Sequence, residues 1–191
     1  FWTGTSYIES YMDDGPAVFS FSAKDIANNI GTSIISGTEF SINNTVYVSS
    51  GGYVSNSDGT TVYVPAYACG ENIHIRIAVP DKNSTRIKAI LPSIYDDLGM
   101  KEISGVNLLR DISATGDVSG KSISAFSTPL TLTIPYPDTN HDGLIDGTSL
   151  DERSLGIFYY HENQGKWILE PDDTINTSSN TVAAAITHLS L

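Results

Sequence analysis

Apolar and polar residues alternate with a period of two along much of the chain. The alternating stretches are residues 17–21, 61–64, 73–79, 130–134, 155–159, 167–169 and 182–191, and they are rich in Thr, Val, Ile and Tyr. Successive side chains of a β-strand point to opposite faces, so this period predicts strands that bury one face. In the last stretch, Val182, Ala184 and Ile186 define such a face, and His188 and Ser190 share it.

Short turn sequences separate these stretches. They are rich in Asp, Asn, Gly and Pro, and they fall at residues 13–16, 57–59, 81–83, 163–165 and 171–173. Turns at such short intervals are typical of antiparallel sandwiches. Helical patterns are scarce: residues 91–98 are compatible with a turn or two, with Pro92 restricted to a starting position. We therefore predict an all-β fold of antiparallel β-sandwiches with little helix.

Charge and composition narrow the classes of partner. The chain has 191 residues, of which 40% are hydrophobic, enough for a buried core. Its 22 acidic and 10 basic residues give a net charge of -12, which disfavours nucleic acid and anionic lipid surfaces. No apolar run approaches the roughly 20 residues that span a bilayer, so we expect no membrane insertion in this segment.

Localisation rests on composition. No basic-then-apolar signal segment opens the chain, so we expect any export signal to lie outside it. Few Lys, Arg and Cys residues with abundant Thr, Ser, Asn, Gly and Tyr are typical of exported prokaryotic proteins. We predict an extracellular or cell-surface location, and neighbouring domains of a larger chain as partners.

Two chemistries are disfavoured by residue count and spacing. Cys69 is the single cysteine, which excludes an intrachain disulfide and CxxC motifs, so we interpret it as a small, partly buried hydrophobic residue. Adjacent carboxylates resemble a glycosidase pair, but neighbours on a strand or turn point apart. We therefore assign a turn-forming role to the pairs Asp13/Asp14, Asp96/Asp97 and Asp172/Asp173.

Five acidic residues lie within residues 138–152, which read DTNHDGLIDGTSLDE. Counted from Asp138, side-chain oxygens occupy positions 1, 3, 5 and 9, in Asp138, Asn140, Asp142 and Asp146. Gly143 stands at position 6, where a calcium loop turns sharply, and Ile145 at position 8, where an apolar residue anchors the loop. Carboxylates held close together repel one another unless a cation offsets them. This spacing predicts a Ca²⁺ site, with the Leu144 carbonyl oxygen and water as further ligands.

The loop departs from the helix-loop-helix calcium motif at its end. Ser149 stands at position 12, where a bidentate Glu is expected, and Asp151 and Glu152 follow as candidates for that ligand after a bulge. Predicted strands flank the loop, which therefore resembles the DxDxDG loops inserted between strands of extracellular modules. The alternative is a solvated hairpin loop in which Asp, Asn and Gly serve the turn.

The N-terminal segment resembles part of a known repeat. Residues 14–29, DGPAVFSFSAKDIANN, and residues 37–42, GTEFSI, are similar to the last strands of a bacterial Ig-like repeat. Such repeats commonly carry an Asp, an Ala-Gly-Asn turn and a closing Phe-x-Ile strand, and Asn28 stands here in place of the Gly. The resemblance covers about half a repeat. It implies that residues 1–45 are the C-terminal strands of an Ig-like unit.

A second resemblance covers residues 49–191. Residues 50–54, SGGYV, and 58–66, DGTTVYVPA, resemble the opening of the ZU-five type of domain found in zonula occludens, ankyrin and netrin-receptor proteins. Residues 126–136, FSTPLTLTIPY, resemble its Phe-Ser-x-Pro-Val strand, and the closing hairpins follow in the same order. The resemblance implies a ZU-five-like β-sandwich over residues 46–191.

The chain ends in the tripeptide His188-Leu189-Ser190 followed by Leu191. The ZU-five family and the related autoproteolysis-inducing domain of adhesion receptors often end in His-Leu-Ser. In cleaving relatives the serine attacks the preceding carbonyl in an N-to-O acyl shift, which implies Ser190 as nucleophile, His188 as base and Leu189-Ser190 as the scissile bond. Side chains two apart on a regular strand are about 7 Å apart, so attack requires a strained backbone. The alternative is a structural hydrogen bond between His188 and Ser190 on the strand.

Three functional hypotheses follow. The first is an extracellular structural or adhesion module with a calcium-stabilised loop, without enzyme activity. The second is an autoprocessing domain that cleaves its own Leu189-Ser190 bond. The third is a module that binds a glycan or protein ligand through surface tyrosines, for which the candidates are Tyr47, Tyr53, Tyr63 and Tyr67.

Overall fold

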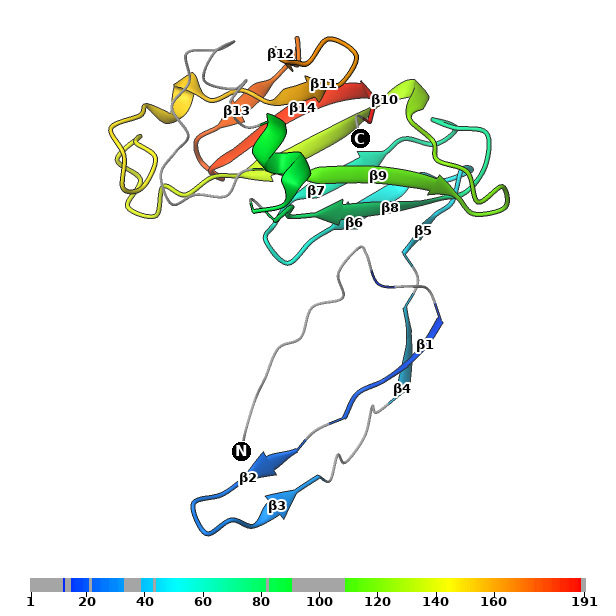
Figure 1. Cartoon of the computed structure of the whole chain (residues 1–191), viewed down its shortest axis with the longest axis vertical. Helices are drawn as coiled ribbons and strands as arrows, with labels where there is room; N and C mark the ends of the chain where they lie inside the picture. The colour runs from blue at the N-terminus through cyan, green and yellow to red at the C-terminus, as the bar shows by residue number, and fades with distance from the viewer. Residues whose placement is uncertain are drawn as a thin grey trace.

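The fold is seen in a computed structural model, which describes residues 12, 15–20, 22–32, 39–42, 44–81, 83–90 and 109–189. Antiparallel strands dominate it and helix is sparse, which confirms the all-β prediction. One sheet has the order β13–β14–β10–β7–β6 (Figure 1). Its strands are Thr174–Asn176, Thr181–His188, Ala125–Pro135, Thr61–Val64 and Gly52–Ser55. The other sheet has the order β5–β8–β9, formed by Thr45–Val46, Ile73–Ala78 and Asp111–Gly116.

The two sheets share one hydrophobic core. Alternation drives this arrangement: on β8, Ile73, Ile75 and Ile77 are fully buried while Arg76 is exposed. The facing side chains come from the buried positions of the five-stranded sheet, including Val62, Val64, Leu130, Leu132, Val182, Ala184 and Ile186. Each buried aliphatic side chain stabilises the fold by about 1.5–3 kcal/mol. The predicted parity of the C-terminal strand is therefore confirmed for its three aliphatic residues.

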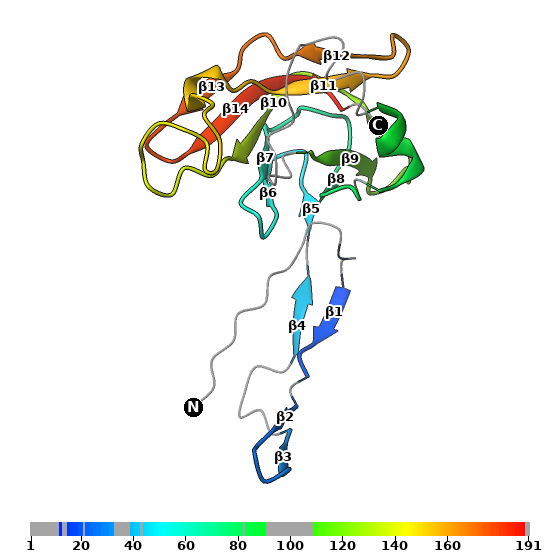
Figure 2. The ribbon, with the colours of Figure 1, turned by 60° about the vertical axis from the view of Figure 1, so that its left-hand side comes forward.

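A separate hairpin packs over the end of the sandwich. It consists of β11 (Phe158–His161) and β12 (Lys166–Leu169), and lies over β10 and β14 in both Figure 1 and Figure 2. A helix that is described over residues 85–90 adjoins it: the Trp167 Nε1 donates to the Ile90 carbonyl oxygen at 3.3 Å. Ser84 caps this helix by accepting from the Ile87 amide at 3.3 Å. Hairpin, sheet and helix together surround a cavity.

The N-terminal strands form a ribbon that extends away from the sandwich (Figures 1 and 2). β1 (Gly15–Val18) pairs with β4 (Glu39–Ile42), and β2 (Ala23–Lys24) pairs with β3 (Ile30–Gly31). Asp25 closes the β2–β3 turn by accepting from the Ala27 and Asn29 amides at 2.8 and 2.9 Å. Asn28 has a φ of 69°, a conformation that Gly or Asn adopts readily. An Asn therefore suits this position of the turn.

Several element boundaries differ from the sequence predictions. The strand predicted at residues 155–159 begins at Phe158, because a 3₁₀ turn at Glu152–Ser154 precedes it and the Ile157 amide donates to Asp173 Oδ2. The last strand ends at His188. The helix at 85–90 and strand β9 were not predicted. Phe21, the helical candidate 91–98 and the pairs Asp13/Asp14 and Asp96/Asp97 lie outside the described residues.

Over the described ranges, no helix has the length and apolar character needed to cross a bilayer.

Candidate functional site

Asp138 is the organising residue of the acidic loop. Its side chain is 2% exposed, with Oδ1 accepting from the Asp142 amide at 3.2 Å and Oδ2 from the Gly143 amide at 3.1 Å. Its carbonyl oxygen accepts from Asn180 Nδ2 at 2.6 Å, which ties the loop to the turn before β14. Gly143 has a φ of 82°, so the sharp turn expected at position 6 is present. The backbone thus wraps around one buried carboxylate.

A second buried carboxylate, Glu152, lies near the same Gly143 turn. Glu152 is 4% exposed, its amide donates to the Gly143 carbonyl oxygen at 3.0 Å, and its Oε2 accepts from the Tyr136 hydroxyl at 2.7 Å. Burial raises the pKa of Tyr136, and the hydrogen bond to Glu152 and the charges of Glu152 and Asp138 add to the rise. Within the described residues, no Lys, Arg or His nitrogen lies within 4.0 Å of either carboxylate.

The other predicted ligands bond within the loop. Asp142 accepts from the Leu144 amide at 2.9 Å and from Asn140 Nδ2 at 2.8 Å. Asp146 accepts from the Thr139 hydroxyl at 2.8 Å. Over the described ranges, no group of three or more His, Cys, Asp and Glu side chains is placed to hold a metal ion. Coordination of Ca²⁺ by Asp142 and Asp146 therefore requires these side chains to exchange hydrogen bonds for the cation, and the calcium site stays a prediction.

The structure distinguishes the two candidates for the last ligand. Asp151 is exposed, and its Oδ1 caps the 3₁₀ turn by accepting from the Arg153 amide at 2.8 Å. Glu152 points inward: a Cβ built on Gly143 would lie 3.9 Å from Glu152 Oε1. Leu144 and Asp151 form an isolated β-bridge, which closes the loop between them. Glu152 is therefore the better placed of the two to complete a metal shell around the turn.

His188 ends the last strand, where it pairs with Ala125, and the Leu189 amide donates to the Ser124 carbonyl oxygen at 2.9 Å. The imidazole lies edge-on to the Tyr159 ring, with ring centroids 4.4 Å apart. Its Nε2 is 3.8 Å from Glu170 Oε1. Leu189 is buried, whereas Ser190 lies outside the described residues. The structure therefore does not test attack by Ser190, and cleavage of the Leu189-Ser190 bond stays a prediction.

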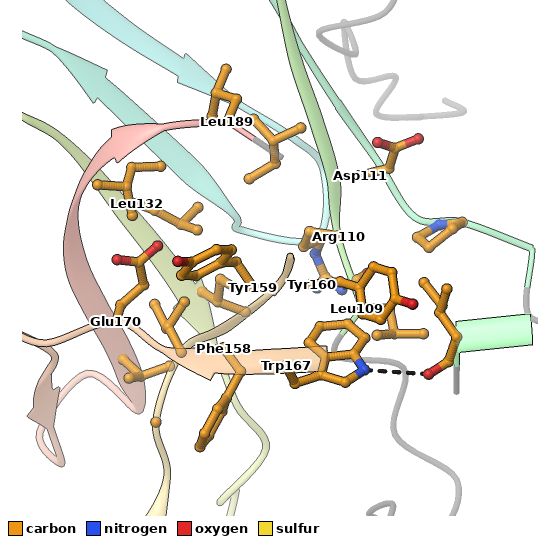
Figure 3. Close-up of a pocket in the computed structure, with 18 of the residues that line it drawn as sticks. Leu109, Arg110, Asp111, Leu132, Phe158, Tyr159, Tyr160, Trp167, Glu170 and Leu189 are labelled. Atoms are coloured by element: carbon orange, nitrogen blue, oxygen red, sulfur yellow. Dashed lines mark hydrogen bonds between the residues drawn. The ribbon is translucent and has the colours of Figure 1, made fainter. Parts of the chain in front are cut away.

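The cavity beside His188 has a volume of about 200 Å³. Figure 3 shows Glu170 and Tyr159 on one side of it and Tyr160 with Trp167 on the other. Glu170 follows β12 and is 5% exposed, held by its amide, which donates to the Ile157 carbonyl oxygen at 2.8 Å. Burial raises the pKa of Glu170, and the nearby His188 partly opposes the rise. Sequence reasoning missed this residue, because an acidic residue before Pro171 is typical of an exposed turn.

The tyrosine candidates are largely at the surface. Tyr47, Tyr53 and Tyr67 are exposed, and Tyr63 is partly buried. Tyr53 and Tyr63 are cross-strand neighbours on β6 and β7, with ring centroids 4.7 Å apart. These two rings form an aromatic pair on the outer face of the five-stranded sheet, because Val54 and Val62 occupy the inner face.

Comparison of the chain with protein-family models, with curated proteins and with solved structures finds no match in any of the three. The ZU-five-like and Ig-like resemblances therefore stay expectations from sequence.

Proposed function

We propose that the chain is an extracellular or cell-surface structural module, with an adhesive role, whose acidic loop binds Ca²⁺. The observation that carries this proposal is the pair of buried carboxylates, Asp138 and Glu152, which flank Gly143 without a positive partner among the described residues. A buried carboxylate is unfavourable unless a charge offsets it. A bound cation between these two residues would supply that charge.

The chemistry of the loop favours Ca²⁺ over other metals. Ca²⁺ takes six to eight oxygen ligands in a flexible shell, whereas Zn²⁺ prefers nitrogen and sulfur. The loop offers carboxylates, the Asn140 amide oxygen and backbone carbonyl oxygens, and His141 is exposed between ligand positions. Extracellular modules bind calcium with dissociation constants of about 10⁻⁴–10⁻³ M, so an exposed loop of this kind suits that environment.

Calcium would act as a structural brace. The loop connects β10 to β11, and Asn180 links Asp138 to the turn before β14. Ordering the loop therefore fixes the end of the β10–β14 pair at which β14 begins, opposite to the end at which His188 pairs with Ala125. We infer that the cation stabilises the sandwich between neighbouring domains of a larger chain. The ribbon of β1–β4 provides the connection on the N-terminal side.

Thermal unfolding with and without calcium tests the proposal. Chelated protein should gain stability on addition of calcium: at 100 times the dissociation constant the gain is about 2.7 kcal/mol, or roughly 5–10 °C in Tm for a chain of this size. Asp142→Asn keeps an oxygen for the Leu144 amide but removes the charge, so we expect it to lose most of the shift.

Asp172→Asn provides the matched control, because Asp172 is an exposed aspartate in a turn outside the loop. This variant should keep the full calcium response. A Tm that is unchanged by calcium up to about 100 mM, 100 times the weakest dissociation constant typical of extracellular modules, in the wild-type chain would remove the proposal.

A second function is supported by the exposed aromatic pair. The rings of Tyr53 and Tyr63, tilted by 37° with centroids 4.7 Å apart, offer apolar surface together with hydroxyl groups, which suits a sugar ring or a protein loop. Binding of the intact chain to a glycan array, compared with Tyr53→Ala, tests this role. Equal signals for the two proteins would rule out this surface as the binding site.

A further inference from the structure

The cavity under the β11–β12 hairpin contains a carboxylate with no hydrogen-bond donor. In the part of the chain that the structure describes, no group donates to Glu170, which is 5% exposed. The nearest positive group is His188, whose Nε2 lies 3.8 Å from Glu170 Oε1, beyond hydrogen-bond distance. Native proteins rarely leave a buried carboxylate in this state. A missing donor at Glu170 is the first indication of a ligand.

The arginines around the cavity are already paired. Arg110 donates to Thr60 Oγ1 at 2.7 Å and to the Leu109 carbonyl oxygen at 2.8 Å, and its Nη2 is 2.9 Å from Asp58 Oδ2. Arg86 pairs with Glu162 at 3.0 Å. Their guanidinium groups are thus compensated at 2.9–3.0 Å, whereas the positive partner of Glu170 among the described residues is His188 Nε2, 3.8 Å away. This balance disfavours an anionic ligand and favours a cation.

The walls of the cavity suit an organic cation rather than a metal ion. Tyr159, Tyr160 and Trp167 contribute aromatic rings, and Leu132 and Ile186 contribute aliphatic surface (Figure 3). The electron-rich faces of aromatic rings attract ammonium groups, and the aliphatic side chains accommodate an alkyl chain. The volume of about 200 Å³ is smaller than the roughly 300–1,000 Å³ of drug-sized sites, so the ligand has few heavy atoms.

We propose that this cavity binds a small primary alkylammonium ion. Its N–H groups donate to the Glu170 carboxylate, and its alkyl chain packs against Leu132, Ile186 and the neighbouring aromatic rings. None of the proposed calcium ligands lines this cavity, although Tyr136, which donates to Glu152, does. The binding is non-covalent and requires no other reactant.

Titration of ¹⁵N-labelled, calcium-saturated protein with n-butylammonium, followed by NMR, tests the site. The matched probe is n-butanol, which has a chain of the same length but no charge. We expect butylammonium to shift the Trp167 indole and the amides of β11, β12 and Glu170, with an affinity at least tenfold higher than that of butanol. This comparison uses the unaltered chain and so does not depend on the folding of a variant.

Two variants of equal charge change locate the site. Glu170→Gln should weaken butylammonium binding at least tenfold, whereas Asp172→Asn, an exposed aspartate two residues away, should leave it unchanged. The proposal is overturned by equal affinities for the amine and the alcohol, by equal binding to wild type and Glu170→Gln, or by the absence of shifts at tens of millimolar amine.

Discussion

Gly51 shows how a single residue fixes the connection between strands. Its φ is 66°, and a Cβ at this position would collide with the Val64 carbonyl oxygen and lie 2.8 Å from the Ala66 amide nitrogen. The atoms it would meet belong to the backbone, so they cannot rotate away as a side chain would. A glycine is therefore required where β6 begins against the end of β7.

Gly51→Ala should destabilise the fold by about 2 kcal/mol or more, because the substitution combines a left-handed backbone with overpacking. Gly70→Ala is the matched control, since Gly70 has open space around it and no positive φ. Urea unfolding of both variants measures the difference. A Gly51→Ala chain as stable as the Gly70→Ala chain would contradict the strained geometry.

The stability contributed by Glu170 should depend on pH. Burial raises its pKa above the ordinary value of 4.5, so the folded chain holds the proton more tightly than the unfolded chain. Stability from this group is therefore fully present below about pH 4.5 and is lost as pH rises through the folded pKa.

Glu170→Gln removes this ionisation. We expect Glu170→Gln to be more stable, relative to wild type, at pH 7 than at pH 4. The change in the stability difference between the two pH values should be about 1 kcal/mol, the usual cost of burying a group without a hydrogen-bond donor. Urea unfolding at both pH values provides the measurement, with Asp172→Asn as the exposed control. A difference that stays constant with pH would show that Glu170 is not buried as described.

At the scale of elements, β8 illustrates what the residue pattern determines. Its strict alternation of isoleucine with polar residues predicted the strand, and the structure places all three isoleucines in the core. β9 escaped prediction, because only Ile112 and Ala114 are apolar within it and its pairing with β8 is a long-range contact. Residues 85–90 hold only three apolar positions, Ile87, Ala89 and Ile90, too few to show a helical period. Local patterns thus reveal strands with strong alternation, whereas partners far along the chain determine the others.

Ile75→Ala should cost about 2–5 kcal/mol, because it removes a fully buried side chain and leaves a cavity between the sheets. The neighbouring residue provides the control: Arg76 is exposed, so Arg76→Ala should change stability by no more than about 0.5 kcal/mol. Equilibrium denaturation of the pair measures both values. Similar losses of stability for the two variants would contradict the burial of Ile75 and the exposure of Arg76.

The acidic loop was predictable only in part, because local spacing reveals local turns but not contacts made through the fold. Spacing alone placed the turn at Gly143 and gave Asp138 its central position. It did not identify Glu152 as the inward carboxylate, because that depends on the 3₁₀ turn and on Tyr136 at the end of β10. The Glu170 cavity was equally out of reach, since β10, β11 and β14 contribute its walls from distant parts of the sequence.

At the scale of the whole molecule, the C-terminal strand connects the proposed functions. β14 pairs with β10, which leads into the acidic loop, and it ends at His188 beside Glu170. The fold therefore places the calcium loop and the C-terminal cavity at positions along the same pair of strands. Calcium bound as proposed would brace the start of a strand whose other end lies beside the cavity.

Self-cleavage at Leu189-Ser190 remains a prediction with its own test at this scale. Intact-mass measurement of a longer chain that continues past Leu191 should show two fragments if the bond breaks, and hydroxylamine should accelerate their release from an ester. Ser190→Ala should then give one species. A single full-length mass for the unaltered chain, at every pH and with hydroxylamine, excludes the autoprocessing role.

The central claim is that buried carboxylates in the loop of residues 138–152 hold a calcium ion. Isothermal titration of the chelated chain with Ca²⁺ tests it most directly, with Glu152→Gln as the variant that keeps the hydrogen bond from Tyr136 but removes the charge. We expect binding of one Ca²⁺ per chain, weakened at least tenfold by Glu152→Gln. The absence of binding heat with millimolar calcium, or equal affinity in the variant, would contradict it.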